Sequence, residues 1–112
     1  MMLDWNGYRK ELSTRIGELA KLTPGTLQGY KALSSARLNT NRLGAKFCEL
    51  IALAVAVTAR CDGCITVHTE AALKAGASRE EIAEALGVAI AVNAGAALVY
   101  SARTLEAVET RS

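Results

Sequence analysis

A chain of 112 residues fits one domain, which we expect to span residues 1–112. Apolar residues make up 51% of the sequence and aromatic residues only 4%, so the core must consist of Ala, Leu, Val and Ile, which favours closely packed helices. The net charge of +2 comes from residues scattered along the chain, without a Lys/Arg cluster or an aromatic platform, which argues against a nucleic-acid partner.

The first residues, 1–6, lack the charged start and the apolar run of a signal peptide. We also expect no apolar stretch long enough to cross a membrane. The predicted compartment is therefore the cytoplasm, without a membrane partner. Because the cytoplasm is reducing, a close pair among the three cysteines indicates a catalytic or metal-binding site before a structural disulfide.

Two helices are predicted in the first third of the chain. Apolar residues recur at helical spacing from Trp5 to Leu22 with charged residues between them, as is typical of an amphipathic helix. Pro24 favours the first turn of a second, shorter helix that carries Leu33 near its end. The polar segment 34–41 is predicted to be a connector.

The middle of the chain predicts two longer helices. The first runs from about Leu43 through Thr58 and is apolar on every side in its second half, where length and Ala content favour a helix over a buried strand. The next helix begins around residue 61 and ends at Gly76, which has the character of a C-terminal cap.

Ser78 and Glu81 have the spacing of a capping box, in which each side chain accepts a hydrogen bond from the other residue's amide. We expect the helix that follows to be interrupted at residues 93–95, Asn-Ala-Gly, and a last helix to run from about Ala96 to Val108. The sequence thus predicts an all-α fold of five to six helices.

Two of the predicted helices are almost wholly apolar, although a domain of this size encloses few positions on all sides. We therefore expect a homo-oligomer, in which other copies bury parts of segments 50–57 and 86–100. The alternative is a single, unusually central helix.

The motif that can carry chemistry is Cys61-Asp62-Gly63-Cys64, at the start of a predicted helix. His68 follows Cys64 by four residues, so both cysteines and His68 share one helical face. The N-terminus of a helix stabilises a thiolate through its free amides and partial positive charge, and His68 can add to this effect, whereas Asp62 opposes it. Since the thiolate is the nucleophile, the pattern favours peroxide reduction or disulfide exchange.

Glu49 is an isolated acid in an apolar part of its predicted helix. If this helix packs antiparallel to the Cys helix, Glu49 can approach the thiols and His68 as a proton relay. The equally open alternative is a surface carboxylate on a polar stripe with Lys46.

A structural zinc site is the main alternative for the cysteines, because Cys61, Cys64 and His68 supply three ligands and Glu49 could supply a fourth. Ligands crowded on one helical turn enclose a metal poorly, so we expect redox chemistry and no metal. A non-catalytic helical assembly domain is a further alternative. Cys48, as a small buried hydrophobe, needs no role.

Three segments together carry a family resemblance: residues 49–56, residues 61–68 with their Cys-x2-Cys-x3-His pattern, and residues 75–86. They resemble the carboxymuconolactone decarboxylase family, and more closely its alkylhydroperoxidase D-type branch. The likeness covers about residues 19–108. It implies an all-helical fold that assembles as a homotrimer or a homohexamer, with the active site among packed helices.

The resemblance also implies that Glu49, Cys61, Cys64 and His68 form the catalytic set of an antioxidant enzyme that needs no bound cofactor. Glu49 and His68 would relay protons. Cys64 would attack a hydroperoxide and become a sulfenic acid, and Cys61 would donate a proton and then form a disulfide with Cys64. Another thiol or dithiol protein would supply the electrons.

Spacing alone leaves the order of the two sulfurs open, because a thioredoxin-like analogy would make Cys61 the nucleophile. The decarboxylase branch lacks the cysteine pair, so lactone chemistry is disfavoured. In one respect the chain departs from the branch, because Gly63 stands where the better-known peroxidases have a histidine between the cysteines.

Overall fold

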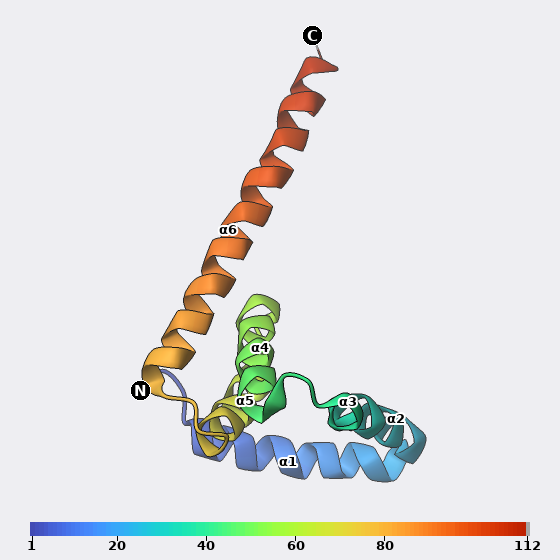
Figure 1. Ribbon diagram of the computed structural model, residues 1–112. Coiled ribbons are helices and arrows are strands. Elements are labelled where there is room, and N and C mark those ends of the chain that lie inside the picture. The colour runs from blue at the N-terminus through green and yellow to red at the C-terminus, as the bar shows by residue number, and fades with distance from the viewer. Residues whose placement is uncertain (112) are drawn as a thin grey trace.

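The computed structural model describes residues 1–111, and in that range all regular structure is helical (Figure 1). The helices are α1 (Trp5–Leu22), α2 (Pro24–Ser35), α3 (Arg37–Thr40), α4 (Gly44–Ala59), α5 (Asp62–Lys74) and α6 (Arg79–Glu109). The predicted all-α fold is confirmed. The predicted connector 34–41 is partly wrong, because the single turn of α3 lies within it.

The core forms where α4 and α5 pack together at the start of α6. Leu53, Ala72 and Ala77 are its buried residues, and Leu50 and Ile82 pack against them. Two of the three buried residues are alanines, which lets the helix backbones approach closely. Helix α5 also packs against α1 on another side, so it lies in contact with both α1 and α4.

Two left-handed residues end the helices on either side of the cysteine pair. Arg60, with φ +56°, follows α4, and the amide of Cys61 donates to the carbonyl of Ala56 (3.0 Å). Gly76, with φ +91°, follows α5, and the next amide, that of Ala77, donates to the carbonyl of Ala72 (2.9 Å). The predicted glycine cap is therefore confirmed, and the first stop places Cys61 where α5 begins.

The predicted interruption at residues 93–95 is wrong, because α6 runs without a break for 31 residues. The side-chain amide of Asn93 donates to the carbonyl of Ala89 and to the hydroxyl of Thr58 on α4, both at 2.8 Å. Asn93 is thus satisfied within a continuous helix. Gly95 makes the helix less stable by about 1 kcal/mol relative to alanine, but the neighbouring alanines are strong helix formers and keep it continuous. The predicted capping box of Ser78 and Glu81 is present, with hydrogen bonds of 2.9 and 3.0 Å.

Because α6 is continuous, it has the length and the hydropathy of a helix that could cross a membrane. The expectation that no apolar stretch reaches that length was therefore wrong. Helix α6 meets this description by length and composition alone, and the central helix of a soluble assembly has the same two properties.

The chain is extended, and much apolar surface is open. Figure 1 shows α6 projecting far beyond α4, with α2 and α3 at the opposite end of the molecule. The radius of gyration is 18.2 Å, whereas a compact domain of this length has about 13 Å. The accessible surface is 8829 Å², whereas a compact monomer of this mass exposes about 5,900 Å².

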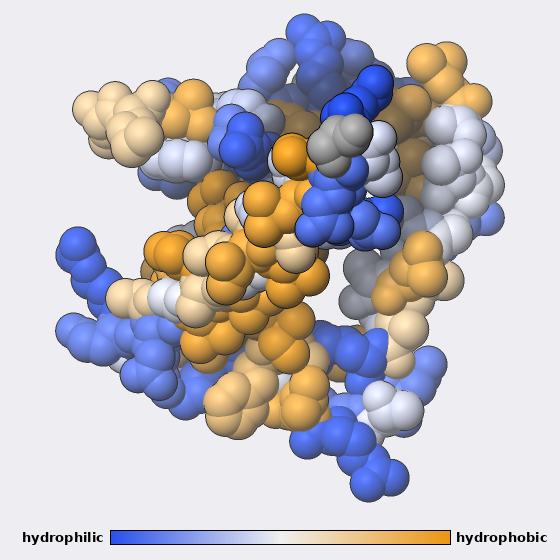
Figure 2. Space-filling view, turned by 90° about the horizontal axis from the view of Figure 1, so that it is seen from above, coloured by the Kyte–Doolittle hydropathy of each residue, from blue (hydrophilic) through white to orange (hydrophobic). Residues whose placement is uncertain are grey.

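Large apolar side chains of α4 and α6 form much of this surface. Phe47, Ile51 and Val55 of α4 are more than half exposed, as are Val88 and Leu98 of α6. Figure 2 shows apolar side chains gathered across the middle of the face seen from above. Between the two helices lies an apolar groove of about 310 Å³.

Candidate thiol site

The cysteine pair lies at the N-terminus of α5. Cys61 is the N-cap residue, and its sulfur accepts a hydrogen bond from the amide of Cys64 (3.1 Å). The two Cα atoms are 5.2 Å apart, and a disulfide joins the side chains. The same amide faces the sulfur of Cys61 at the positive end of the helix dipole, so this position favours a thiolate when the pair is reduced.

Glu49 and His68 meet across the interface of α4 and α5. One carboxylate oxygen of Glu49 lies 2.7 Å from Nδ1 of His68. The side chain of Glu49 is only 15% exposed and that of His68 is 31% exposed. The alternative interpretation, in which Glu49 is a surface carboxylate beside Lys46, is therefore wrong. Lys46 instead donates a hydrogen bond to Glu81 (2.8 Å).

The pair of Glu49 and His68 adjoins the cysteines through α5 itself. His68 follows Cys64 by four residues in the same helix, which places the two on one face, one turn apart. When Nδ1 of a neutral His68 donates to Glu49, Nε2 is left as a proton acceptor. The chain can therefore hold a carboxylate, an imidazole and two sulfurs at one helix junction.

The residues considered for a zinc site are partnered with one another. Among residues 1–111, His, Cys, Asp and Glu side chains form no group of three or more that could hold a metal ion. Nδ1 of His68 already bonds Glu49, and each sulfur of the pair is bonded to the other. Cys48 is a free cysteine and is partly buried on α4.

Residues of α1 that the sequence did not single out also border the cysteines. A Cβ atom added to Gly63 would lie 2.6 Å from Cδ2 of Leu12 and 4.0 Å from Cε1 of Tyr8. Helix α1 therefore packs directly on the turn that joins Cys61 to Cys64. The signal in the sequence is Gly63 itself, since a glycine inside a helix often marks a close approach.

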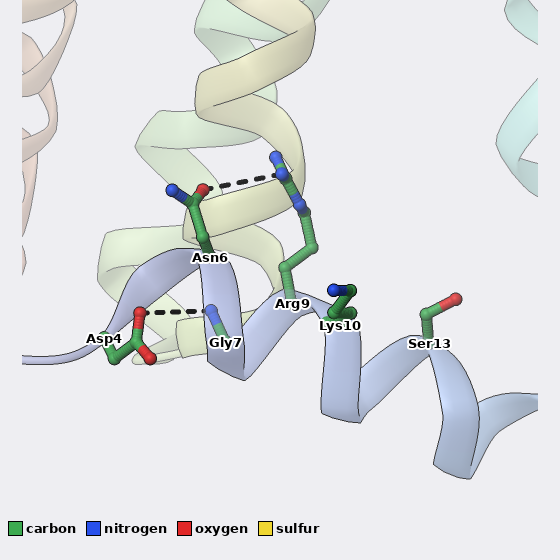
Figure 3. A pocket seen from close by; sticks show the side chains of 6 residues that line it. All are labelled: Asp4, Asn6, Gly7, Arg9, Lys10 and Ser13. Atoms are coloured by element: carbon green, nitrogen blue, oxygen red, sulfur yellow. Dashed lines mark hydrogen bonds between the residues drawn. The ribbon is translucent and has the colours of Figure 1, made fainter.

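A surface hollow of about 640 Å³ lies elsewhere on α1 (Figure 3). It is lined by Asp4, Asn6, Gly7, Arg9, Lys10 and Ser13. In Figure 3 the side chains of Asn6 and Arg9 point to one side of α1, and Asp4 caps the helix by accepting a hydrogen bond from the amide of Gly7 (3.1 Å). The hollow contains none of the four predicted site residues, so it does not form part of the thiol site.

Comparison with known proteins assigns the chain to a family. Residues 24–107 match the model of the carboxymuconolactone decarboxylase family. An uncharacterised protein of Haemophilus influenzae is 54% identical over 107 residues, which cover 96% of this chain and 95% of that protein. An uncharacterised protein of Cupriavidus necator is 33% identical over 105 residues, 94% of this chain and 93% of its own length.

The fold has a counterpart among solved structures. The apo crystal structure of lpg0406, a carboxymuconolactone decarboxylase family protein of Legionella pneumophila, has a TM-score of 0.75 to this chain. The two sequences are 35% identical, and the match covers 91% of each chain.

Proposed function

Because the chain belongs to the carboxymuconolactone decarboxylase family, we propose that it is an enzyme of the thiol-redox type within it, a peroxidase that cycles Cys61 and Cys64 between dithiol and disulfide. The observation that carries the proposal is the position of this disulfide one helical turn from the hydrogen-bonded pair of Glu49 and His68. Such a site combines a nucleophile, a resolving thiol and a proton relay.

The chemistry balances with these groups alone. A hydroperoxide is the oxidant, and His68 takes the proton from the Cys64 thiol. The Cys64 thiolate attacks the outer peroxide oxygen, the O–O bond breaks, and the departing alkoxide takes the proton of the Cys61 thiol and leaves as alcohol. Cys64 is then a sulfenic acid. The Cys61 thiolate left by that transfer attacks the sulfur of Cys64, the S–S bond forms, the S–O bond breaks, and the departing hydroxide takes the proton held by His68 and leaves as water. Two thiols lose two electrons, and the peroxide gains them.

The position of Cys61 favours a thiolate at its sulfur, which suits attack in either step. Its sulfur accepts the amide of Cys64, and a thiolate held there is ready to attack the sulfenic acid. The order of the two sulfurs nevertheless rests on the family resemblance. The cycle closes when a second thiol or dithiol protein reduces the disulfide by exchange, which requires no bound cofactor.

We propose that the working form is a homo-oligomer, a trimer or a hexamer, in the cytoplasm. The support is the open apolar surface of α4 and α6 and the groove between them, since isolated proteins seldom expose apolar patches of this extent. A second copy of this chain offers the same apolar surface in return, as symmetric assembly requires.

A count of free thiols tests the proposal. The reduced protein should lose two thiols with one equivalent of hydroperoxide, and a dithiol reductant should restore them. Cys48→Ser, the matched control, should still lose two, whereas Cys61→Ser and Cys64→Ser should form no intrachain disulfide. If the parent protein keeps all its thiols after hydroperoxide is added, the proposed peroxidase activity is ruled out. Thiols that react only after zinc is chelated would favour a metal-binding module instead.

A further inference from the structure

Helix α1 lies outside the segment that matches the family model, which begins at residue 24. It nevertheless contacts α5 along one stripe of that helix. The hydroxyl of Thr66 donates to the carbonyl of Trp5 (3.3 Å), and Thr66 is only 7% exposed. One turn further along α5, Glu70 forms an ion pair with Arg9. Residues three or four apart share a helix face, so these contacts anchor α1 beside the cysteine turn.

The third contact of the stripe is at the cysteine pair itself. The space in front of Gly63 is filled by the tip of Leu12, with the ring of Tyr8 beside it. Both apolar side chains are partly buried there. Because Gly63 lies between the two cysteines, a reagent that approaches their sulfurs from this side meets Leu12 and Tyr8 first. Glu49 comes from α4, the other packing partner of α5, and hydrogen-bonds His68 of α5 itself.

We propose that Leu12 and Tyr8 determine access to the Cys61–Cys64 pair, by admitting small hydroperoxides and small thiols while hindering bulky thiol-reactive molecules on the Gly63 side. The proposal rests on the proposed function only in taking this pair as the working group. Gly63 permits Leu12 and Tyr8 to lie over this turn, since the side chain of any larger residue would occupy the same space as Leu12.

Alkylation of the reduced protein tests the proposal whether or not the pair reduces peroxides. In a Cys48→Ser background, we compare the rates at which iodoacetamide and a maleimide carried on a polyethylene glycol chain modify Cys61 and Cys64. Leu12→Ala should raise the rate of the bulky reagent about tenfold, because the smaller side chain leaves the cysteine turn open more often. It should change the iodoacetamide rate less than about twofold. Leu22→Ala is the matched control, because Leu22 lies on the same helix and is 84% exposed.

Gly63→Ala provides a second, independent variant. Its methyl group displaces the tip of Leu12 and should also speed the bulky reagent, whereas Gly17→Ala, with open space around it, should not. In Gly63→Ala with Leu12→Ala, the new methyl group fits the vacated space, so the rate should fall below that of Leu12→Ala alone.

Circular dichroism identifies any variant that fails to fold, and the other variant then decides. The proposal is overturned if folded Leu12→Ala and Gly63→Ala keep the parent's rate with the bulky reagent. It is also overturned if both reagents speed up equally, because that result indicates general loosening of the helices. Loss of peroxide reduction with the size effect intact would reject the peroxidase alone.

Discussion

The carboxylate of Glu49 lies 2.7 Å from Nδ1 of His68, although the two residues are 19 positions apart and belong to different helices. Neither side chain is open to water over most of its surface. A carboxylate that holds one nitrogen of an imidazole fixes its tautomer and orients the other nitrogen. Under the proposed function this pair relays protons, with the second nitrogen of His68 as the acceptor.

Glu49→Gln and His68→Gln should each slow the loss of thiols to hydroperoxide by about a hundredfold, the usual contribution of a positioned acid or base. Both changes keep the size of the side chain and its capacity to hydrogen-bond. Stopped-flow measurement of thiol loss at several pH values gives the rates. Glu84→Gln, an exposed carboxylate of α6, is the matched control and should react like the parent. Parent rates in both site variants would discard the relay and leave the cysteine pair acting alone.

Light scattering at micromolar concentration should give a mass that is a multiple of the 11.8 kDa chain. Val92 is 66% exposed in a single chain and lies at the groove between α4 and α6. Val92→Lys should therefore break the assembly, since it would bury a charge between copies. Ser13→Lys, on the exposed surface of α1, should keep the parent mass. A stable monomer of the parent would show that the apolar helices need no second copy.

Arg60→Gly should stabilise the protein. Arg60 has φ +56°, a conformation that costs a residue with a side chain about 1–2 kcal/mol, and glycine adopts it freely but loses more entropy on folding. The net gain should be up to about 1 kcal/mol, or a rise in Tm of about 4–8 °C. Arg42→Gly, at an exposed position without positive φ, should lower Tm or leave it unchanged. A lower Tm for Arg60→Gly would contradict the assignment of strain.

The ion pair of Lys46 and Glu81 should make stability depend on pH. The hydrogen bond from Lys46 holds the pKa of Glu81 below its ordinary value of 4.5, and the amide of Ser78 lowers it further. A carboxylate with a lowered pKa in the folded state stabilises the protein above pH 4.5, and this contribution disappears as pH falls through the folded value.

Lys46→Met should therefore lose less stability than the parent when denaturation is measured at neutral pH and again below pH 4.5. The side chain of Lys46 is 35% exposed and that of Glu81 is 41% exposed, so the difference should be small and should shrink in high salt. Lys31→Met, which removes an exposed lysine of α2, should follow the parent's pH profile. Equal pH profiles for Lys46→Met and the parent would show that the pair contributes nothing.

The sequence by itself determined most of the helices and several of their ends. The bounds of α1 coincide with the predicted segment, and Gly76 and the capping box of Ser78 and Glu81 lie where predicted. Helical periodicity, a glycine after the last turn and a serine before the first are signals between near neighbours, so they do not depend on how the helices pack. The cysteine motif is local in the same sense.

Only the tertiary structure decided the contacts between helices. In the structure Glu49 hydrogen-bonds His68, and Lys46 hydrogen-bonds Glu81. Helical spacing alone did not select these partners, because they depend on how α4 packs against α5 and α6. The same dependence explains the missed break, since Asn93 is satisfied by a hydroxyl on α4, 35 residues earlier. A side chain pairs with the group that tertiary packing brings within hydrogen-bond distance. Periodicity along one helix does not encode the distances between helices.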